Sequence, residues 1–149
     1  MTTCQNDPIG RLVYMTTMAM KTCVENRVKP YDLTAEQFHV LKSLSEEHGI
    51  TQNQLCEMVM KSPANMTRIL DRLEKKECIE RRANPDDRRS SLVNLTPGGE
   101  DLLRLVRLEL NDFEAEITAG LSNQQIQDIK DGLKIIHANI LELTRRYEK

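Results

Sequence analysis

Residues 62–96 read SPANMTRILDRLEKKECIERRANPDDRRSSLVNLT, and the period of the hydrophobic residues changes halfway through this stretch. In the first half, apolar residues recur every three or four positions, namely Met66, Ile69, Leu70 and Leu73. This spacing predicts an amphipathic helix with one face against a core. Ser62 and Pro63 are typical of a helix start, because serine caps free backbone N–H groups and proline fits the first helical position.

The polar face of this helix carries groups that can read DNA. Asn65, Arg68 and Arg72 are spaced by three and four residues, so they share one ridge. In a major groove, an Asn amide can pair with adenine and an Arg guanidinium with guanine. The alternative is an ordinary solvated face. The residues of this helix predicted to contact DNA are Ser62, Ala64, Asn65, Thr67, Arg68 and Arg72.

The second half alternates in twos, which predicts two short strands in the segments 77–83 and 90–96. Between them, Asn84-Pro85-Asp86-Asp87 has the composition of a tight turn, and two arginines follow it directly. A helix followed by a hairpin with a basic tip is the layout of a winged helix. The wing residues predicted to contact DNA are Asp87, Arg88 and Arg89.

The stretch RILDRLEKK…IERRANPDDRRSSLVNLT resembles the MarR family of winged helix-turn-helix transcriptional regulators. The matching elements are D-R-L-E at 71–74, E-R at 80–81, Asp-x-Arg at 87–89 and L-T followed by Gly-Gly at 95–99. The resemblance implies that Arg89 reaches the minor groove and that Asp87 holds it by a salt bridge. The chain departs from the family after the helix, where Glu77 and Cys78 stand in place of a usual glycine and an apolar residue. Glu77 is therefore expected to accept a left-handed cap geometry, unless the helix ends differently.

Length and composition favour one mostly helical domain. The chain has 149 residues, 6 Gly, 5 Pro and 3% aromatic residues, which suits a single core rather than two independent ones. The expected fold class is mainly α with a small two-stranded β wing. In a single domain over 1–149, we expect a winged helix-turn-helix DNA-binding lobe at 34–96 and a helical dimerisation region at 1–30 and 100–149.

The charge is unevenly distributed along the chain. The formal net charge is −2, but residues 61–89 carry nine positive and six negative side chains, a net of +3, so the remainder carries −5. A basic face on an acidic body directs DNA to one side of the molecule.

Before the quoted stretch, the sequence predicts three helices. The first runs from Ile9 to Val28, and its Met15, Met18 and Met20 are interpreted as core rather than as the lining of a ligand pocket. Capping-box patterns at Thr34-x-x-Gln37 and Thr51-x-x-Gln54 predict the second and third helices, which gives the helix-turn-helix order. Gln52 and Lys61 are also predicted to contact phosphates. For Gln52, the alternative is an ordinary surface residue.

After the wing, Thr96-Pro97 predicts a fifth helix through Leu102 and Ile117 toward Gly120, and Ser122-x-x-Gln125 predicts a last one. Its apolar residues are spaced 3-4-3-4 through Ile126, Ile129, Leu133, Ile136, Ile140 and Leu143 to Tyr147. We call this set the seam. Such a seam needs a partner helix, and it is the predicted dimerisation surface. The alternative is packing on the preceding helix of the same subunit.

The sequence gives little support for catalysis, a metal or a cofactor. It has no nucleophile elbow and no phosphate-binding glycine loop, so we expect no enzyme. His39, His48 and His137 lie on different predicted helices without ligand spacing. No cysteine pair has C-x-x-C spacing among Cys4, Cys23, Cys56 and Cys78, and no signal peptide or long apolar run is present. We therefore expect a cytoplasmic protein with reduced thiols and no membrane partner.

The leading hypothesis is a dimeric, ligand-responsive repressor that binds a palindromic double-stranded DNA operator. The resemblance implies a small aromatic or phenolic effector, anionic in the family. One alternative is a protein-interaction module that reuses the winged helix, but a basic wing suits phosphates better. The other is a thiol-based redox regulator; the family's thiol-sensing branch has its reactive cysteine near the start of the first helix, where this chain has Gly10.

Overall fold

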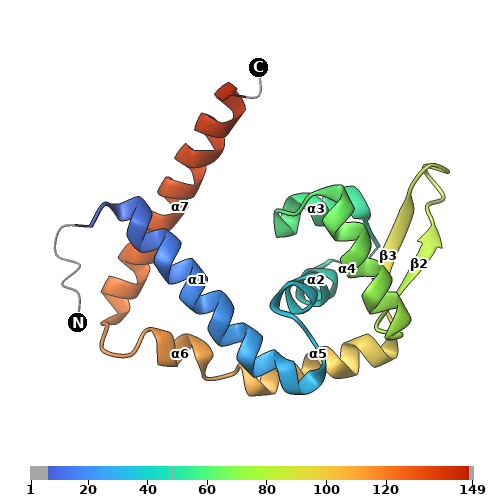
Figure 1. Ribbon diagram of the computed structural model, residues 1–149, viewed down its shortest axis with the longest axis horizontal. Helices are drawn as coiled ribbons and strands as arrows, with labels where there is room; N and C mark the ends of the chain where they lie inside the picture. The colour runs from blue at the N-terminus through green and yellow to red at the C-terminus, as the bar shows by residue number, and fades with distance from the viewer. Residues whose placement is uncertain (1–6, 48, 148–149) are drawn as a thin grey trace. The chain divides into compact units, whose positions relative to one another are not determined.

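The computed structural model describes residues 7–47 and 49–147, and these residues form two compact units that divide between Leu110 and Asn111. The first unit contains α1 (Ile9–Val28), the 3-10 helix η1 (Lys29–Tyr31), α2 (Ala35–Glu46), β1 (Ile50–Thr51), α3 (Gln52–Val59), α4 (Pro63–Lys75), β2 (Ile79–Ala83), β3 (Ser91–Leu95) and α5 (Pro97–Glu109). The second contains α6 (Phe113–Ile117) and α7 (Asn123–Tyr147). Figure 1 shows these elements along the chain. The predicted mainly helical winged fold is confirmed.

The capping boxes predicted for α2 and α3 are both present. Thr34 Oγ1 accepts from the backbone N of Gln37 at 3.2 Å, while Gln37 Oε1 accepts from the backbone N of Thr34 at 3.1 Å. Thr51 and Gln54 repeat the arrangement at the start of α3. These bonds satisfy N–H groups that have no partner within a helix, so the local sequence fixes where α2 and α3 begin.

The core of the first unit lies around α2, which contacts α1, α3, α4, α5 and β3. The fully buried side chains of this core come from α2 itself and from the elements around it, namely Val28, Val40, Leu41, Leu44, Leu55, Met66, Leu70, Leu73, Val93 and Val106. The helix that carries the predicted DNA-reading face is thus held by a core shared with the wing and with α5.

The sheet has one strand more than the sequence predicted. β1 joins the two wing strands in the antiparallel order β1-β3-β2, and Ile50 stands opposite Val93. β2 and β3 pair over five residues, from Ile79 opposite Leu95 to Ala83 opposite Ser91. β1 has only two residues, too few to show an alternating pattern in the sequence, and the burial of Ile50 holds the base of the wing against the core.

The end of α4 shows how the chain accommodates Glu77 at a position where the family usually has glycine. Glu77 has φ 57°, its N donates to the carbonyl of Glu74 at 2.9 Å, and the N of Cys78 donates to the carbonyl of Leu73 at 3.0 Å. This is a Schellman cap formed with a glutamate in the left-handed position, as expected for that residue. Beside it, Gly99 leaves no room for a side chain, because a Cβ there would lie 1.9 Å from the Cys78 carbonyl oxygen.

Two expectations about the helices are wrong. The fifth helix does not continue toward Gly120: α5 ends at Glu109, and α6 begins at Phe113, with the boundary between the units in this break. Asn111 and Asp112 occupy the break, where Asn111 Nδ2 donates to Asp112 Oδ1, and such side chains compete with the helical backbone. Met15, Met18 and Met20, interpreted as core, are 39–47% exposed on α1 in this single chain.

Candidate nucleic-acid interface

α3 and α4 form a helix-turn-helix with a tight turn. Met60 closes α3 in the left-handed conformation with φ 52°, and the N of Lys61 donates to the Cys56 carbonyl at 3.0 Å. Ser62 then caps α4, because its Oγ accepts from the backbone N of Asn65 at 3.4 Å. The predicted cap is therefore confirmed, and the serine hydroxyl is used in starting the helix.

The faces of α4 separate as the spacing predicted. Met66, Ile69, Leu70 and Leu73 are at most 7% exposed. The opposite side is exposed and carries Ala64, Asn65, Arg68, Asp71, Arg72 and Lys75. On it, Arg68 Nη2 donates to Asn65 Oδ1 at 2.6 Å, so the amide and the guanidinium already lie together. The two groups predicted to read bases therefore form one hydrogen-bonded unit at the first turns of the helix.

Gln52 and Thr67 contact each other instead of lying free on the surface. Gln52 Nε2 donates to Thr67 Oγ1 at 2.8 Å and lies 3.4 Å from the Pro63 carbonyl oxygen. Thr67 Oγ1 in turn donates to the same carbonyl at 3.0 Å. In this structure the Gln52 amide holds the first turns of α4 against α3, which differs from the predicted role of phosphate donor.

Lys61, the other predicted phosphate contact, is bound within the protein. Its Nζ lies 2.5 Å from Glu36 Oε1 on α2, and Lys21 on α1 lies 4.0 Å from the same oxygen. The hydrogen bond from Lys61 holds the pKa of Glu36 below its usual value, against the opposing effect of partial burial. A phosphate that contacts Lys61 must therefore compete with this carboxylate.

The wing tip is shaped by side-chain bonds to the backbone. Asn84 Oδ1 accepts from the N of Asp86 at 3.0 Å, and Asn84 Nδ2 donates to Ser90 Oγ at 2.9 Å. Asp87 Oδ1 accepts from the backbone N of Arg89 at 2.9 Å. In the described part of the chain the Asp87 carboxylate forms no ion pair with the Arg89 guanidinium, so the salt bridge that the resemblance implied is replaced here by a turn contact. Arg88 and Arg89 are exposed.

Arg81 joins the wing to α4, a contact that was not predicted from the sequence. Its Nη1 lies 2.6 Å from Glu74 Oε2 and its Nη2 lies 2.7 Å from Asp71 Oδ1, while its side chain is 23% exposed. Arg82 pairs with Glu80 at 2.5 Å. Both arginines are among the nine positive side chains of residues 61–89, but carboxylates neutralise both. The spacing of Asp71 and Glu74 on one helix face was a signal for a basic partner.

The cations left for a ligand are thus fewer than the sequence count. Between residues 61 and 89, those without a carboxylate partner in the described ranges are Arg68, Arg72, Lys75, Arg88 and Arg89. Three lie on α4 and two on the wing tip, and Figure 1 shows the β2–β3 hairpin projecting beside α4. Two neighbouring basic elements, one helical and one extended, are suited to a groove and the backbone next to it.

Among the described residues, the thiols and histidines form no second site. Cys23 and Cys56 are half-buried and Cys78 is buried, and burial raises the pKa of the Cys56 and Cys78 thiols. Over residues 7–47 and 49–147, no group of three His, Cys, Asp or Glu side chains is arranged to hold a metal, and no helix is long and apolar enough to cross a membrane. Cys4 and His48 lie outside the described residues.

The seam on α7 is apolar and open to solvent. Its central residues Ile129, Leu133, Ile140 and Leu143 are 44–52% exposed, and Ile126 and Ile136 are half-buried. Ser122 and Gln125 form the predicted capping box at the helix start. A helix with this much exposed apolar surface has a face available for a partner.

Comparisons with known proteins identify what this arrangement is similar to. A sequence model of the MarR family matches residues 33–91. The multiple antibiotic resistance protein MarR of Salmonella typhimurium is 35% identical over 130 residues, 87% of this chain and 90% of that protein, and its Escherichia coli counterpart is 34% identical over 85% of this chain and 89% of its own. A crystal structure of a mutant Escherichia coli MarR complexed with operator DNA has a TM-score of 0.82 at 30% identity, covering 91% of this chain and 98% of that one.

Proposed function

Since this chain belongs to the MarR family and is a DNA-binding transcriptional regulator, we propose that it is a ligand-responsive repressor that binds a palindromic operator as a homodimer. The observation that supports DNA reading is the pairing of two basic elements. The hydrogen-bonded Asn65 and Arg68 lie on α4, and the uncompensated Arg88 and Arg89 lie on the wing tip. An interaction module has no need of guanidinium groups left without carboxylate partners on both elements.

The exposed residues of α4 divide into reading and holding groups. We assign Asn65 and Arg68, on the first turns, to contacts with base edges, because recognition helices present their N-terminal residues to the groove. Arg72 lies one turn further along and lines hollows toward α2 on the side of the helix. We assign it, with the N-terminal cap at Ser62 and the exposed Ala64, to contacts with the DNA backbone and the groove wall.

Alanine substitutions separate these roles. Arg68→Ala is expected to lower operator affinity by about 1–3 kcal/mol and to relax preference at one base pair, because a bidentate contact to a base is lost. Arg72→Ala is expected to weaken operator and random DNA alike and to reduce the slope of log affinity against log salt by about 0.9. Fluorescence anisotropy on both DNAs over a range of salt measures both effects. Equal losses on the two DNAs for Arg68→Ala would remove it from the reading group.

Selective binding to an operator requires two copies of the chain, because one winged helix contacts only a short piece of DNA. A single winged helix touches a few base pairs and phosphates, too few to select one site among a genome of competitors. The exposed seam on α7 is the surface we assign to the two-fold contact. In such a dimer the two α4 helices would face half-sites centred about 34–36 Å apart, one helical turn of DNA.

A cavity on the first unit is the place we assign to an effector. It has a volume of about 340 Å³ and is bounded by α1, α2 and the end of α3, and its lining residues are Thr17, Met20, Lys21, Val24, Ala35, Glu36, His39, Val59 and Lys61. Its walls are mostly apolar, and Lys21 and Lys61 share the single carboxylate of Glu36, so a net positive charge remains for an anion. A small aromatic acid fits such a mixture, with its ring against Met20 and Val24 and its carboxylate toward the lysines. Binding there would disturb the Glu36–Lys61 pair next to the start of α4.

The effector is tested by titrating 2-hydroxybenzoate into the operator complex, with neutral 2-hydroxybenzamide as the matched control. The acid is expected to release DNA and the amide to leave it bound, because only the acid offers a charge to Lys21 and Lys61. Met20→Trp, which fills the cavity, should keep operator affinity and remove the response to the acid. Release by both compounds, or an unchanged response in Met20→Trp, would place the effector elsewhere.

A further inference from the structure

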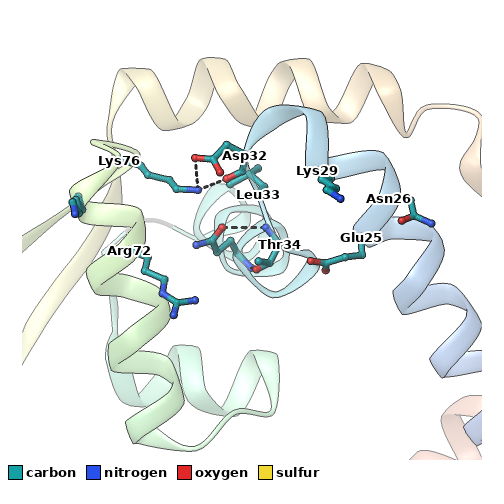
Figure 2. A pocket seen from close by; sticks show the side chains of 10 residues that line it. Glu25, Asn26, Lys29, Asp32, Leu33, Thr34, Arg72 and Lys76 are labelled. Carbon is teal, nitrogen blue, oxygen red and sulfur yellow. Dashed lines mark hydrogen bonds and ion pairs between the residues drawn. The ribbon is translucent and has the colours of Figure 1, made fainter.

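One ion pair joins the C-terminal end of α4 to Asp32, the residue that follows α1 and η1. Lys76, which follows α4 directly, has its Nζ 3.0 Å from Asp32 Oδ2, and the same ammonium group also donates to the backbone carbonyl of Asp32. Figure 2 shows both contacts as they cross from α4 to the turn before α2. Asp32 closes η1, which continues α1 without a break. This pair links α4, the proposed recognition helix, to the segment that begins with α1 and continues through η1.

The other chain segment that leaves the lobe is attached at the same place. Thr96 Oγ1 donates to the Glu77 carbonyl at 2.5 Å, and the N of Thr96 donates to the Cys78 carbonyl at 3.1 Å. Thr96 caps α5, and Gly99 in its first turn lies against the backbone of Cys78. Residues 76–78 are therefore the joint at which the turn after α1 and the start of α5 meet the end of α4.

A hollow beside this joint separates α4 from α1, so the Lys76–Asp32 pair is important for the orientation of α4. It has a volume of about 720 Å³, with Glu25, Asn26 and Lys29 on one side and Arg72 and Lys75 on the other. In Figure 2, Arg72 on α4 stands well apart from Glu25 and Asn26 on α1. Glu25 does not reach across, since its Oε2 accepts from the backbone N of Ala35 at 2.7 Å. Among the lining residues, Lys76 and Asp32 form the ion pair that spans from α4 to the α1 side.

We propose that Lys76, through its pair with Asp32, is a positioning residue that sets the angle at which α4 meets the major groove. This inference rests on the proposed function, because it concerns how operator DNA is read. The side chain of Asp32 is 92% exposed and that of Lys76 is 29% exposed, so the pair contributes little to the stability of the fold. The pair instead affects the direction of α4, because contacts to base edges require side chains to be placed within a fraction of an ångström.

The geometry of Asp32 supports this role. It has φ 55°, a left-handed conformation that aspartate and asparagine tolerate better than most residues. In this conformation the residue presents its carboxylate and its carbonyl to the same ammonium group. Asparagine at this position keeps the turn and removes only the charge, so Asp32→Asn is a clean test of the pair.

The test compares affinity for a palindromic fragment from beside the protein's own coding region with affinity for random DNA. Asp32→Asn is expected to lower the ratio of the two affinities about three- to tenfold, while binding to random DNA is unchanged or stronger. If charge alone mattered, Asp32→Asn would instead bind the palindrome more tightly, because removing a negative charge strengthens binding to every DNA. Lys76→Gln should lower the ratio similarly, and Lys76→Arg should retain it, because arginine can pair with Asp32.

Three controls distinguish positioning from other effects. Asp101→Asn removes an exposed carboxylate that pairs with Arg104 at 3.0 Å on α5 and has no part in the Lys76–Asp32 pair, so it should leave the ratio unchanged. Asp32→Asn with Lys76→Gln should be no worse than Lys76→Gln alone, because both remove one interaction. Melting temperatures should stay close to that of the parent. An unchanged ratio in Asp32→Asn and Lys76→Gln overturns the positioning role, whereas a parent that does not prefer the palindrome overturns the proposed function itself.

Discussion

Ile136→Asp combined with Ile140→Asp is expected to abolish operator binding, with affinity falling by about 10³-fold or more to the level of non-specific DNA. Both side chains belong to the seam on α7, far in sequence from the wing. Two carboxylates in an apolar contact would have to lose their water without a partner, which separates the subunits. A single subunit then has too few contacts to select its site. Sedimentation velocity and fluorescence anisotropy on the same samples measure assembly and binding together.

Ile135→Asp is the matched control for this experiment. Ile135 is the immediate neighbour of Ile136, is 62% exposed, and lies outside the 3-4 spacing of the seam. The same substitution there should leave both the dimer and operator binding intact. Circular dichroism of both variants shows whether α7 remains helical. Tight palindrome binding by the Ile136→Asp/Ile140→Asp variant would contradict the assignment of the seam.

Arg89→Ala is expected to lower operator affinity by about 1–3 kcal/mol, roughly 5- to 150-fold, with no change in melting temperature. The side chain lies on the exposed wing tip and has no carboxylate partner in the described part of the chain, so its contacts are left for DNA. Asp87→Ala should have a smaller effect of the same sign. Its carboxylate accepts from the backbone N of Arg89 and so shapes the turn that presents the arginine.

The control for the wing is Arg104→Ala, which removes an exposed arginine paired with Asp101 on α5. It should leave operator affinity unchanged. If Arg89→Ala bound the palindrome as the parent does at every salt concentration, the wing would have no part in holding DNA, and the interaction-module alternative would gain support.

Local features of the fold could be predicted from the sequence because they depend on neighbours in the chain. The caps at Ser62 and Thr51 and the buried stripe of α4 involve residues within a few positions of one another. The left-handed Glu77 followed from comparing one position with the usual glycine of the family. β1 and the break after Glu109 were missed, since a two-residue strand has no period and an apolar spacing continues across the break.

The candidate site was harder to predict where its geometry depends on distant residues. Lys61 meets Glu36 from 25 positions away, and Lys76 meets Asp32 from 44 positions away. A count of positive charge treats these lysines as free, and it treats Arg81 in the same way although Asp71 and Glu74 bind it. Packing decides which cations remain available, and packing is not visible in spacing along one segment.

Binding of one homodimer to one palindrome can be measured by sedimentation velocity of the parent protein at micromolar concentration, alone and with the palindromic fragment. Alone, the protein should sediment at twice the 17.2 kDa of one chain. With DNA, two chains should move with each fragment, and a fragment that keeps one half-site and scrambles the other should bind far more weakly. A monomer of 17.2 kDa that still binds the palindrome tightly, one chain to each fragment, would show that operator binding does not require a dimer.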